Sequence, residues 1–167
     1  MCFLFLIGVA GIYFRQIESA GWLGLIGYGL FSLSWLIQIG FVFTELFVLP
    51  PLASAAPQFI DSVLAIVNPA SPASMDVGGL GTAYAVIGVL YLLGGIVFGI
   101  ATVRARVLPK WPAILLAVTA FVTPFAVLVP HEIQRFAAVP MGIAFIWLGY
   151  AVWTGQRSLT ARANAAA

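Results

Sequence analysis

Charged residues are scarce in this chain of 167 residues. Seven Lys or Arg and five Asp or Glu make up 7% of it, whereas an ordinary soluble domain carries roughly 25%. Apolar residues account for 63%, and a soluble fold of this size could not cover its surface with so few polar groups. The sequence therefore predicts an all-α integral membrane protein, a helical bundle surrounded by membrane lipids.

Cysteine and histidine are almost absent. The single cysteine, Cys2, excludes an intrachain disulfide and any Cys-x-x-Cys redox or zinc site. The single histidine, His131, excludes a haem held by two histidines of this chain. The net charge of +2 is too small to indicate a nucleic-acid partner. We therefore expect neither a cofactor nor nucleic acid as a partner.

Signatures of enzymes are also missing. The sequence has no Gly-x-Ser-x-Gly elbow, no Walker phosphate loop and no row of acids that could hold magnesium. His131 and Glu132 begin like the zinc motif His-Glu-x-x-His, but Arg135 occupies the position of the second histidine. The sequence therefore predicts a non-enzymatic protein without a metal site.

Four apolar segments are long enough to cross a bilayer, because a hydrocarbon core of about 30 Å needs roughly 20 helical residues. Pro50 and Pro51 should end the first segment, since neither can donate to a helix ladder. Pro124 should kink the third, with Thr119 or Thr123 helping to satisfy the backbone. The four segments are Trp22–Leu49, Leu80–Val103, Trp111–Val129 and Glu132–Trp153.

Two shorter segments complete the predicted architecture. Met1–Phe14 reaches only about 21 Å as a helix, so it is either a truncated first helix or a short helix packed on the bundle. Pro57–Val67 predicts an interfacial helix within an outer loop, residues 50–79. We expect one transmembrane domain, residues 1–154, and a flexible cytoplasmic tail, residues 155–167.

The placement of basic residues predicts the orientation. In an alternating topology Arg135 is the only one of seven that falls on the outer side. The other six are Arg15, Arg104, Arg106, Lys110, Arg157 and Arg162. An aromatic belt at the same inner interface comprises Tyr13, Trp22, Trp111 and Trp153. We expect a multi-pass protein of a cytoplasmic (inner) membrane, with the N-terminus outside and the C-terminus cytoplasmic.

Small residues indicate where helices pack closely, because lipid offers them no hydrophobic reason to associate. Gly142 and Gly149 in the last span are candidates to receive another helix. The clearest row lies on one face of the second long segment and comprises Gly81, Ala85, Gly88, Gly95 and Gly99. This face is either a dimer seam or a contact within the chain.

Glu45 is the main candidate for a functional residue, because an acid at membrane depth is expensive. Ser34, Gln38 and Glu45 are spaced to share one helix face, which could line a polar crevice or a proton path. Three alternatives remain open: an ion pair between Glu45 and Arg135, a protonatable or metal-binding cluster of Glu45 with His131 and Glu132, or simple exposure of the outer loop.

Three segments carry a resemblance, namely Phe43–Ala53 (FTELFVLPPLA), Val107–Trp111 (VLPKW) and Trp147–Trp153 (WLGYAVW). Together they resemble a loose group of uncharacterised bacterial polytopic membrane proteins with four to five spans. The resemblance implies a bacterial inner membrane and a longer first helix in relatives. It supplies no catalytic residues.

Three functions are compatible with these features. The first is an accessory or structural subunit of a membrane assembly, with other subunits or a second copy of the chain as partners. The second is a small proton-coupled carrier that uses Glu45, Gln38 and Ser34. The third is lipid, quinone or pigment binding between aromatic-rich helices, such as those carrying Trp35, Tyr91 and Trp147.

Overall fold

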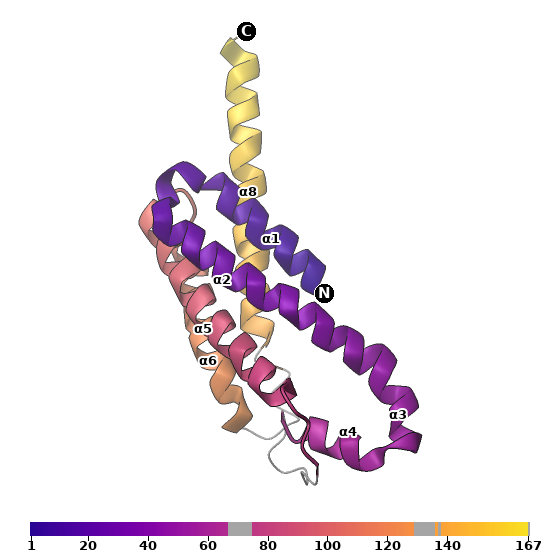
Figure 1. Ribbon diagram of the computed structural model, residues 1–167. Coiled ribbons are helices and arrows are strands. Elements are labelled where there is room, and N and C mark those ends of the chain that lie inside the picture. Colours follow the sequence, from indigo (N-terminus) through magenta and orange to yellow (C-terminus); the bar gives the residue numbers. More distant parts are fainter. Residues whose placement is uncertain (67–74, 129–135, 137, 167) are drawn as a thin grey trace.

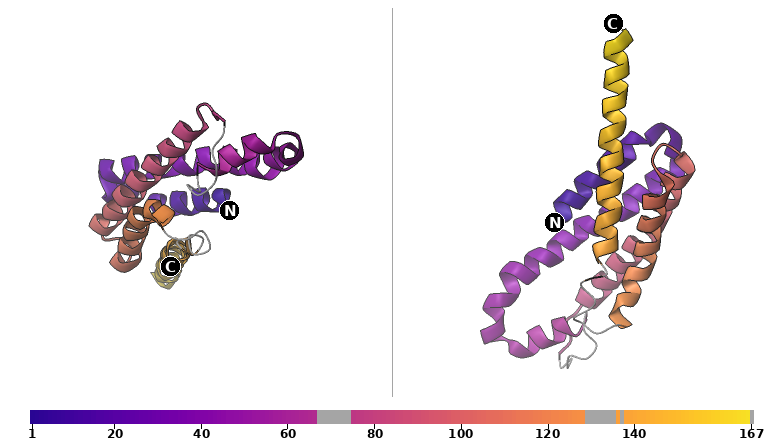
Figure 2. Two further views of the ribbon diagram at one scale, coloured as in Figure 1. Left: turned by 90° about the horizontal axis from the view of Figure 1, so that it is seen from below. Right: turned by 180° about the vertical axis from the view of Figure 1, so that it is seen from behind.

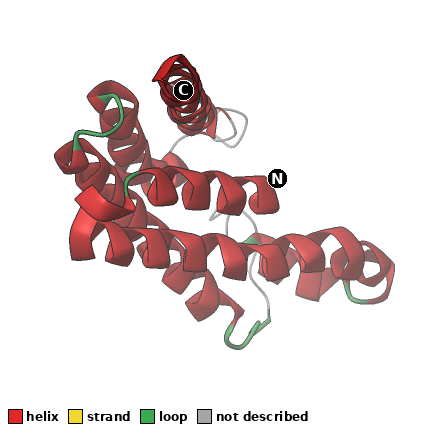
Figure 3. Ribbon diagram, turned by 90° about the horizontal axis from the view of Figure 1, so that it is seen from above, coloured by secondary structure: helices red, strands yellow, loops and turns green. Residues whose placement is uncertain are grey.

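The protein is described by a computed structural model over residues 1–66, 75–128, 136 and 138–166, and all regular structure in these residues is helical (Figure 3). The predicted all-α class is thus confirmed for the described part of the chain. The helices are α1 (Cys2–Arg15), α2 (Ile17–Phe43), α3 (Leu49–Ala55), α4 (Pro57–Leu64), α5 (Leu80–Ala105), α6 (Lys110–Val122) and α8 (Ala138–Ala166). A π-helical turn, Thr44–Val48, joins α2 to α3, and a 3-10 segment, Thr123–Leu128, follows α6.

The first two helices form an antiparallel hairpin. Tyr13 stacks on Tyr28 with ring centroids 4.6 Å apart, and Phe5 stacks on Trp35 at 4.4 Å. Residues late in α1 therefore meet residues early in α2. Such offset stacks add to the burial of the rings, so α1 is held along the bundle as a short packed helix (Figure 1).

α2 and α5 approach most closely in the core of the bundle. A Cβ added at Gly27 would lie 2.5 Å from the backbone nitrogen of Phe98, and one at Gly94 would collide with the backbone of Phe31. The two glycines therefore let the helix backbones touch. Phe31 and Phe98, whose backbones make these contacts, are completely buried.

The predicted row of small residues on α5 is only partly used. A Cβ at Gly99 would lie 2.9 Å from the carbonyl oxygen of Ala113, and one at Gly95 would collide with Ala120. Both glycines thus pack on α6 within the chain. Ala85 is exposed, and nothing lies within 4 Å of a Cβ at Gly81 or Gly88.

The prediction that Gly142 and Gly149 receive another helix is wrong for the described part of the chain. No atom of the described chain lies within 4 Å of a Cβ at Gly142 or Gly149. α6 receives α5 instead, because alanines at positions 113, 117 and 120 leave room for the glycines.

Among the described residues, three helices are long and apolar enough to cross a membrane: Ile17–Ala55, Leu80–Ala105 and Ala138–Gly155. The expected count of four is not confirmed, because α6 has only 13 residues, or about 20 Å of α-helix. Beyond Val122 the helix tightens to the 3-10 form around Pro124, which cannot donate to the α-helical ladder. The Thr123 hydroxyl donates to the Thr119 carbonyl at 2.7 Å. That oxygen also accepts the Thr123 N–H, so this bond does not satisfy the Ala120 carbonyl, whose usual donor Pro124 lacks.

Pro50 and Pro51 do not end the helical path, contrary to the prediction. The π-helical turn comes first, and the prolines fall in the first turn of α3, where their missing N–H groups are not needed. The chain then continues helically to Ala55 and turns into α4, which begins at Pro57 as expected (Figure 1).

The basic residues gather at one end of the bundle. Arg15 ends α1, Arg104 lies in the last turn of α5, and Lys110 begins α6. We call this the basic end. α8 runs parallel to α1, since Gly8 lies against Phe145 and Gly155 against Arg15. It continues to Ala166, so residues 155–166, predicted as a tail, belong to a helix that projects beyond the basic end (Figure 2).

Candidate functional site

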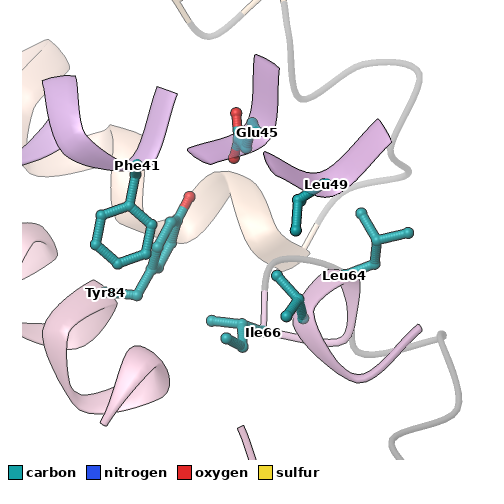
Figure 4. A pocket seen from close by; sticks show the side chains of 7 residues that line it. Phe41, Glu45, Leu49, Leu64, Ile66 and Tyr84 are labelled. Atoms are coloured by element: carbon teal, nitrogen blue, oxygen red, sulfur yellow. The ribbon is translucent and has the colours of Figure 1, made fainter. Parts of the chain in front are cut away.

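Glu45 lies in the π-helical turn between α2 and α3, at the end of the bundle opposite the basic end (Figure 1). A π turn inserts an extra residue into a helix and is frequent at functional sites. The carboxylate is exposed and lines a groove of about 360 Å³ (Figure 4). The groove is lined by Phe41, Glu45, Leu49, Val63, Leu64, Ile66 and Tyr84.

Two polar side chains stand among the apolar walls of this groove. The Tyr84 hydroxyl points toward the side of the groove that carries Glu45 (Figure 4). The phenol and the carboxylate interact electrostatically. The Tyr84 ring meets Phe41 edge to face, with centroids 5.6 Å apart. The site thus combines one carboxylate, one phenol and an aromatic pair.

α4 forms the third wall because it is amphipathic and is tied down by Ser62. The Ser62 hydroxyl donates to the Gln58 carbonyl at 2.9 Å and accepts from the backbone N–H of Met75 at 2.9 Å. The first bond lies within α4, and the second ties the chain at Met75 to α4. Val63 and Leu64 then face the groove, while Asp61 is exposed and does not line it.

The predicted polar face of α2 is not a continuous path. Ser34 is 1% exposed, and its hydroxyl donates to the Phe31 carbonyl of its own helix at 2.7 Å. Gln38 is half-buried and does not line the groove. Of the three residues, only Glu45 reaches the groove.

His131, Glu132 and Arg135 lie outside the described residues, so their pairing with Glu45 stays a prediction. Within residues 1–66, 75–128 and 138–155, Glu45 forms no ion pair. The same part of the chain holds no group of three His, Cys, Asp or Glu side chains that could bind a metal ion.

A buried polar contact near the basic end was not foreseen. The Gln16 side chain is 1% exposed and donates from Nε2 to the Thr102 hydroxyl at 2.8 Å. That hydroxyl donates in turn to the Phe98 carbonyl at 2.9 Å. The contact fastens the turn between α1 and α2 to α5. Its only signal in the sequence was a glutamine beside an apolar helix.

Of the three aromatic residues suggested for ligand binding, two lie together and the third lies apart. Trp35 and Tyr91 pack against each other with centroids 5.8 Å apart, inside the core. Trp147 is exposed on α8 and lines a separate shallow groove with Ile146 and Tyr150. Packing within the chain therefore accounts for Trp35 and Tyr91 but not for Trp147, and ligand binding between these helices stays a prediction.

The predicted aromatic belt is partly present at the basic end. Trp22, Trp111 and Trp153 are all more than half exposed there, as an interfacial position requires. Tyr13 departs from the prediction because it is buried against Tyr28.

The chain was compared with known families, curated proteins and solved structures. No family model matches it, and no curated protein or solved structure is significantly similar to it. The resemblance to uncharacterised bacterial polytopic membrane proteins therefore stays a prediction.

Proposed function

We propose that the protein is a non-enzymatic subunit of a membrane assembly. One observation carries the proposal: residues 36–55, the second half of the longest apolar helix, contain no buried residue. The first half of that helix, in contrast, packs on α1 and α5. A helix that leaves its own bundle in this way offers a long surface to another membrane helix.

Aromatic side chains on this surface support the proposal. Phe43 and Phe47 are both more than half exposed and pack on each other at 5.0 Å between ring centroids. Leu46 and Val48 extend the same apolar surface. Large, rigid rings of this kind give a partner helix much contact area at low cost in conformational entropy.

The basic end supports the proposed location. It joins Arg15, Arg104, Arg106 and Lys110 with three exposed tryptophans, the combination typical of a cytoplasmic membrane interface. The proposed location is therefore a bacterial cytoplasmic membrane, with the C-terminus inside and the N-terminus outside. Cysteine substituted for Asp76 should react with a membrane-impermeant maleimide from outside cells, and cysteine substituted for Arg106 should not.

Purification in a mild detergent tests the proposed role. The account expects a homo-oligomer or a partner chain in fixed stoichiometry after extraction. A lone monomer under conditions that preserve other membrane complexes would contradict it. Extraction into lipid discs without detergent exchange serves as the second condition, because detergent alone separates some weak assemblies.

A second candidate function is supported by the position of Glu45. A carboxylate in a π turn that opens onto a groove suits a small proton-coupled carrier. Carbodiimide should then label Glu45, and Glu45→Gln should abolish proton-coupled flux in vesicles, whereas Asp61→Asn should preserve it. A change in thermal stability without any change in flux would exclude the carrier.

A further inference from the structure

The groove beside Glu45 has room for one small ligand. Its volume of about 360 Å³ falls within the range of roughly 300–1,000 Å³ usual for ligand sites. Apart from Glu45 and Tyr84, its walls are hydrocarbon side chains from α2, α3, α4 and the chain that follows α4. An apolar body placed there would leave water, which stabilises binding by about 25 cal/mol per Å².

The charge of the groove is negative. Among the residues that the structure describes, Glu45 is the only charged residue that lines it, and no basic side chain does so. Within the described residues Glu45 has no ion-pair partner. The rings of Phe41 and Tyr84 add negatively polarised faces, which attract cations. The groove therefore favours a positively charged ligand.

The ligand should carry no phosphate. A phospholipid amine headgroup would bring a phosphate into a groove whose described lining has no basic side chain to receive it. Glu45 would also repel that phosphate. A small cation on an apolar body meets neither difficulty.

We propose that the groove lined by Glu45, Tyr84 and α4 binds a small hydrophobic cation, meaning a quaternary or protonated amine on an apolar body. The carboxylate pairs with the cation, the aromatic pair flanks it, and Leu49, Val63 and Leu64 cover the apolar body. This inference goes beyond the proposed subunit role, because it requires neither a partner chain nor transport.

Equilibrium dialysis of the full-length protein in a neutral maltoside detergent tests this site. The probe is benzyltrimethylammonium, and its neutral carbon isostere, neopentylbenzene, is the reference. The cation should bind saturably to the wild type and about tenfold or more weaker to Glu45→Gln, which corresponds to about 1.4 kcal/mol. Asp61→Asn removes a nearby carboxylate outside the groove and should leave binding within about twofold.

Two further variants separate charge from shape. Glu45→Asp keeps the charge and should retain most of the binding, even if Glu45→Gln proves unstable. Leu49→Trp fills the groove, leaves the carboxylate in place and should abolish binding. Binding is scored per chain, so the result is independent of any oligomer and of the proposed subunit role.

Three outcomes would overturn the proposal. Cation binding could be insensitive to Glu45→Gln, or Glu45→Gln could weaken the binding of the neutral isostere as much as it weakens the binding of the cation. Phosphatidylethanolamine could bind where the cation does not. Finally, no cation could bind while Glu45→Gln and Arg135→Gln lower the melting temperature non-additively, which would identify an ion pair between these two residues.

Discussion

The two ends of the bundle are built differently. In the closed half, which comprises α1, residues 17–35 of α2, residues 87–105 of α5 and α6, glycines let backbones touch and phenylalanines are fully buried. In the open half, which comprises residues 36–55, α4 and residues 80–86, no atom of the described chain lies within 4 Å of a Cβ added at Gly40 or Gly81. Packing therefore stabilises mainly the closed half. Glu45 and the groove lie in the open half.

The largest loss of unfolding free energy is expected when a phenylalanine of the closed half, Phe31, is replaced. Phe31→Ala removes a fully buried ring that contacts Phe98, Tyr91 and Phe145, and should cost about 3 kcal/mol or more. Phe43→Ala, in the open half of the same helix, removes an exposed ring and should cost less than about 0.5 kcal/mol in the isolated chain. Thermal unfolding of both variants in detergent measures the contrast, and equal losses would refute it.

A smaller contrast is expected between two glycines of α2. Gly27→Ala puts a methyl group against the backbone of α5 and should cost about 2 kcal/mol through overpacking. Gly40→Ala meets open space and should be neutral or stabilise the helix by up to about 1 kcal/mol. Melting temperatures that move in the same direction for both variants would show that the halves are packed alike.

The smallest contrast concerns two threonines. Thr102→Val leaves the buried amide of Gln16 without its acceptor and should cost about 1 kcal/mol. Thr44→Val removes an exposed bond in which the hydroxyl donates to the Gly40 carbonyl one turn earlier, so the cost should be a few tenths of a kcal/mol. The double variant Gln16→Leu with Thr102→Val should recover part of the loss in the same unfolding assay. If it does not, the hydrogen bond is not the cause.

Composition was enough to predict an all-helical chain with helices long and apolar enough to cross a membrane, because such a chain has few other ways to satisfy its backbone in lipid. Local rules also placed the start of α4 at Pro57 and the contact made by Gly95 and Gly99. They failed at Pro50 and Pro51, where a π turn sets up a new first helical turn that tolerates proline.

The groove itself lay beyond sequence reasoning. Glu45 stood out as an acid at membrane depth, but its neighbours Val63 and Tyr84 come from α4 and α5. No periodicity within one helix links these positions. Gly27 was overlooked for the same reason, since its partner Phe98 is distant in sequence and only the crossing of α2 and α5 reveals the contact.

In the proposed assembly, another membrane chain completes the open half. Native mass spectrometry of the protein in lipid discs tests it with two matched variants. One replaces Phe43 and Phe47 by Ala; the other replaces Phe121 and Phe125, a pair of similar exposure and spacing outside the open half. The account predicts a complex in the wild type that is lost only in the first variant. A monomeric wild type, or equal loss in both variants, would contradict it.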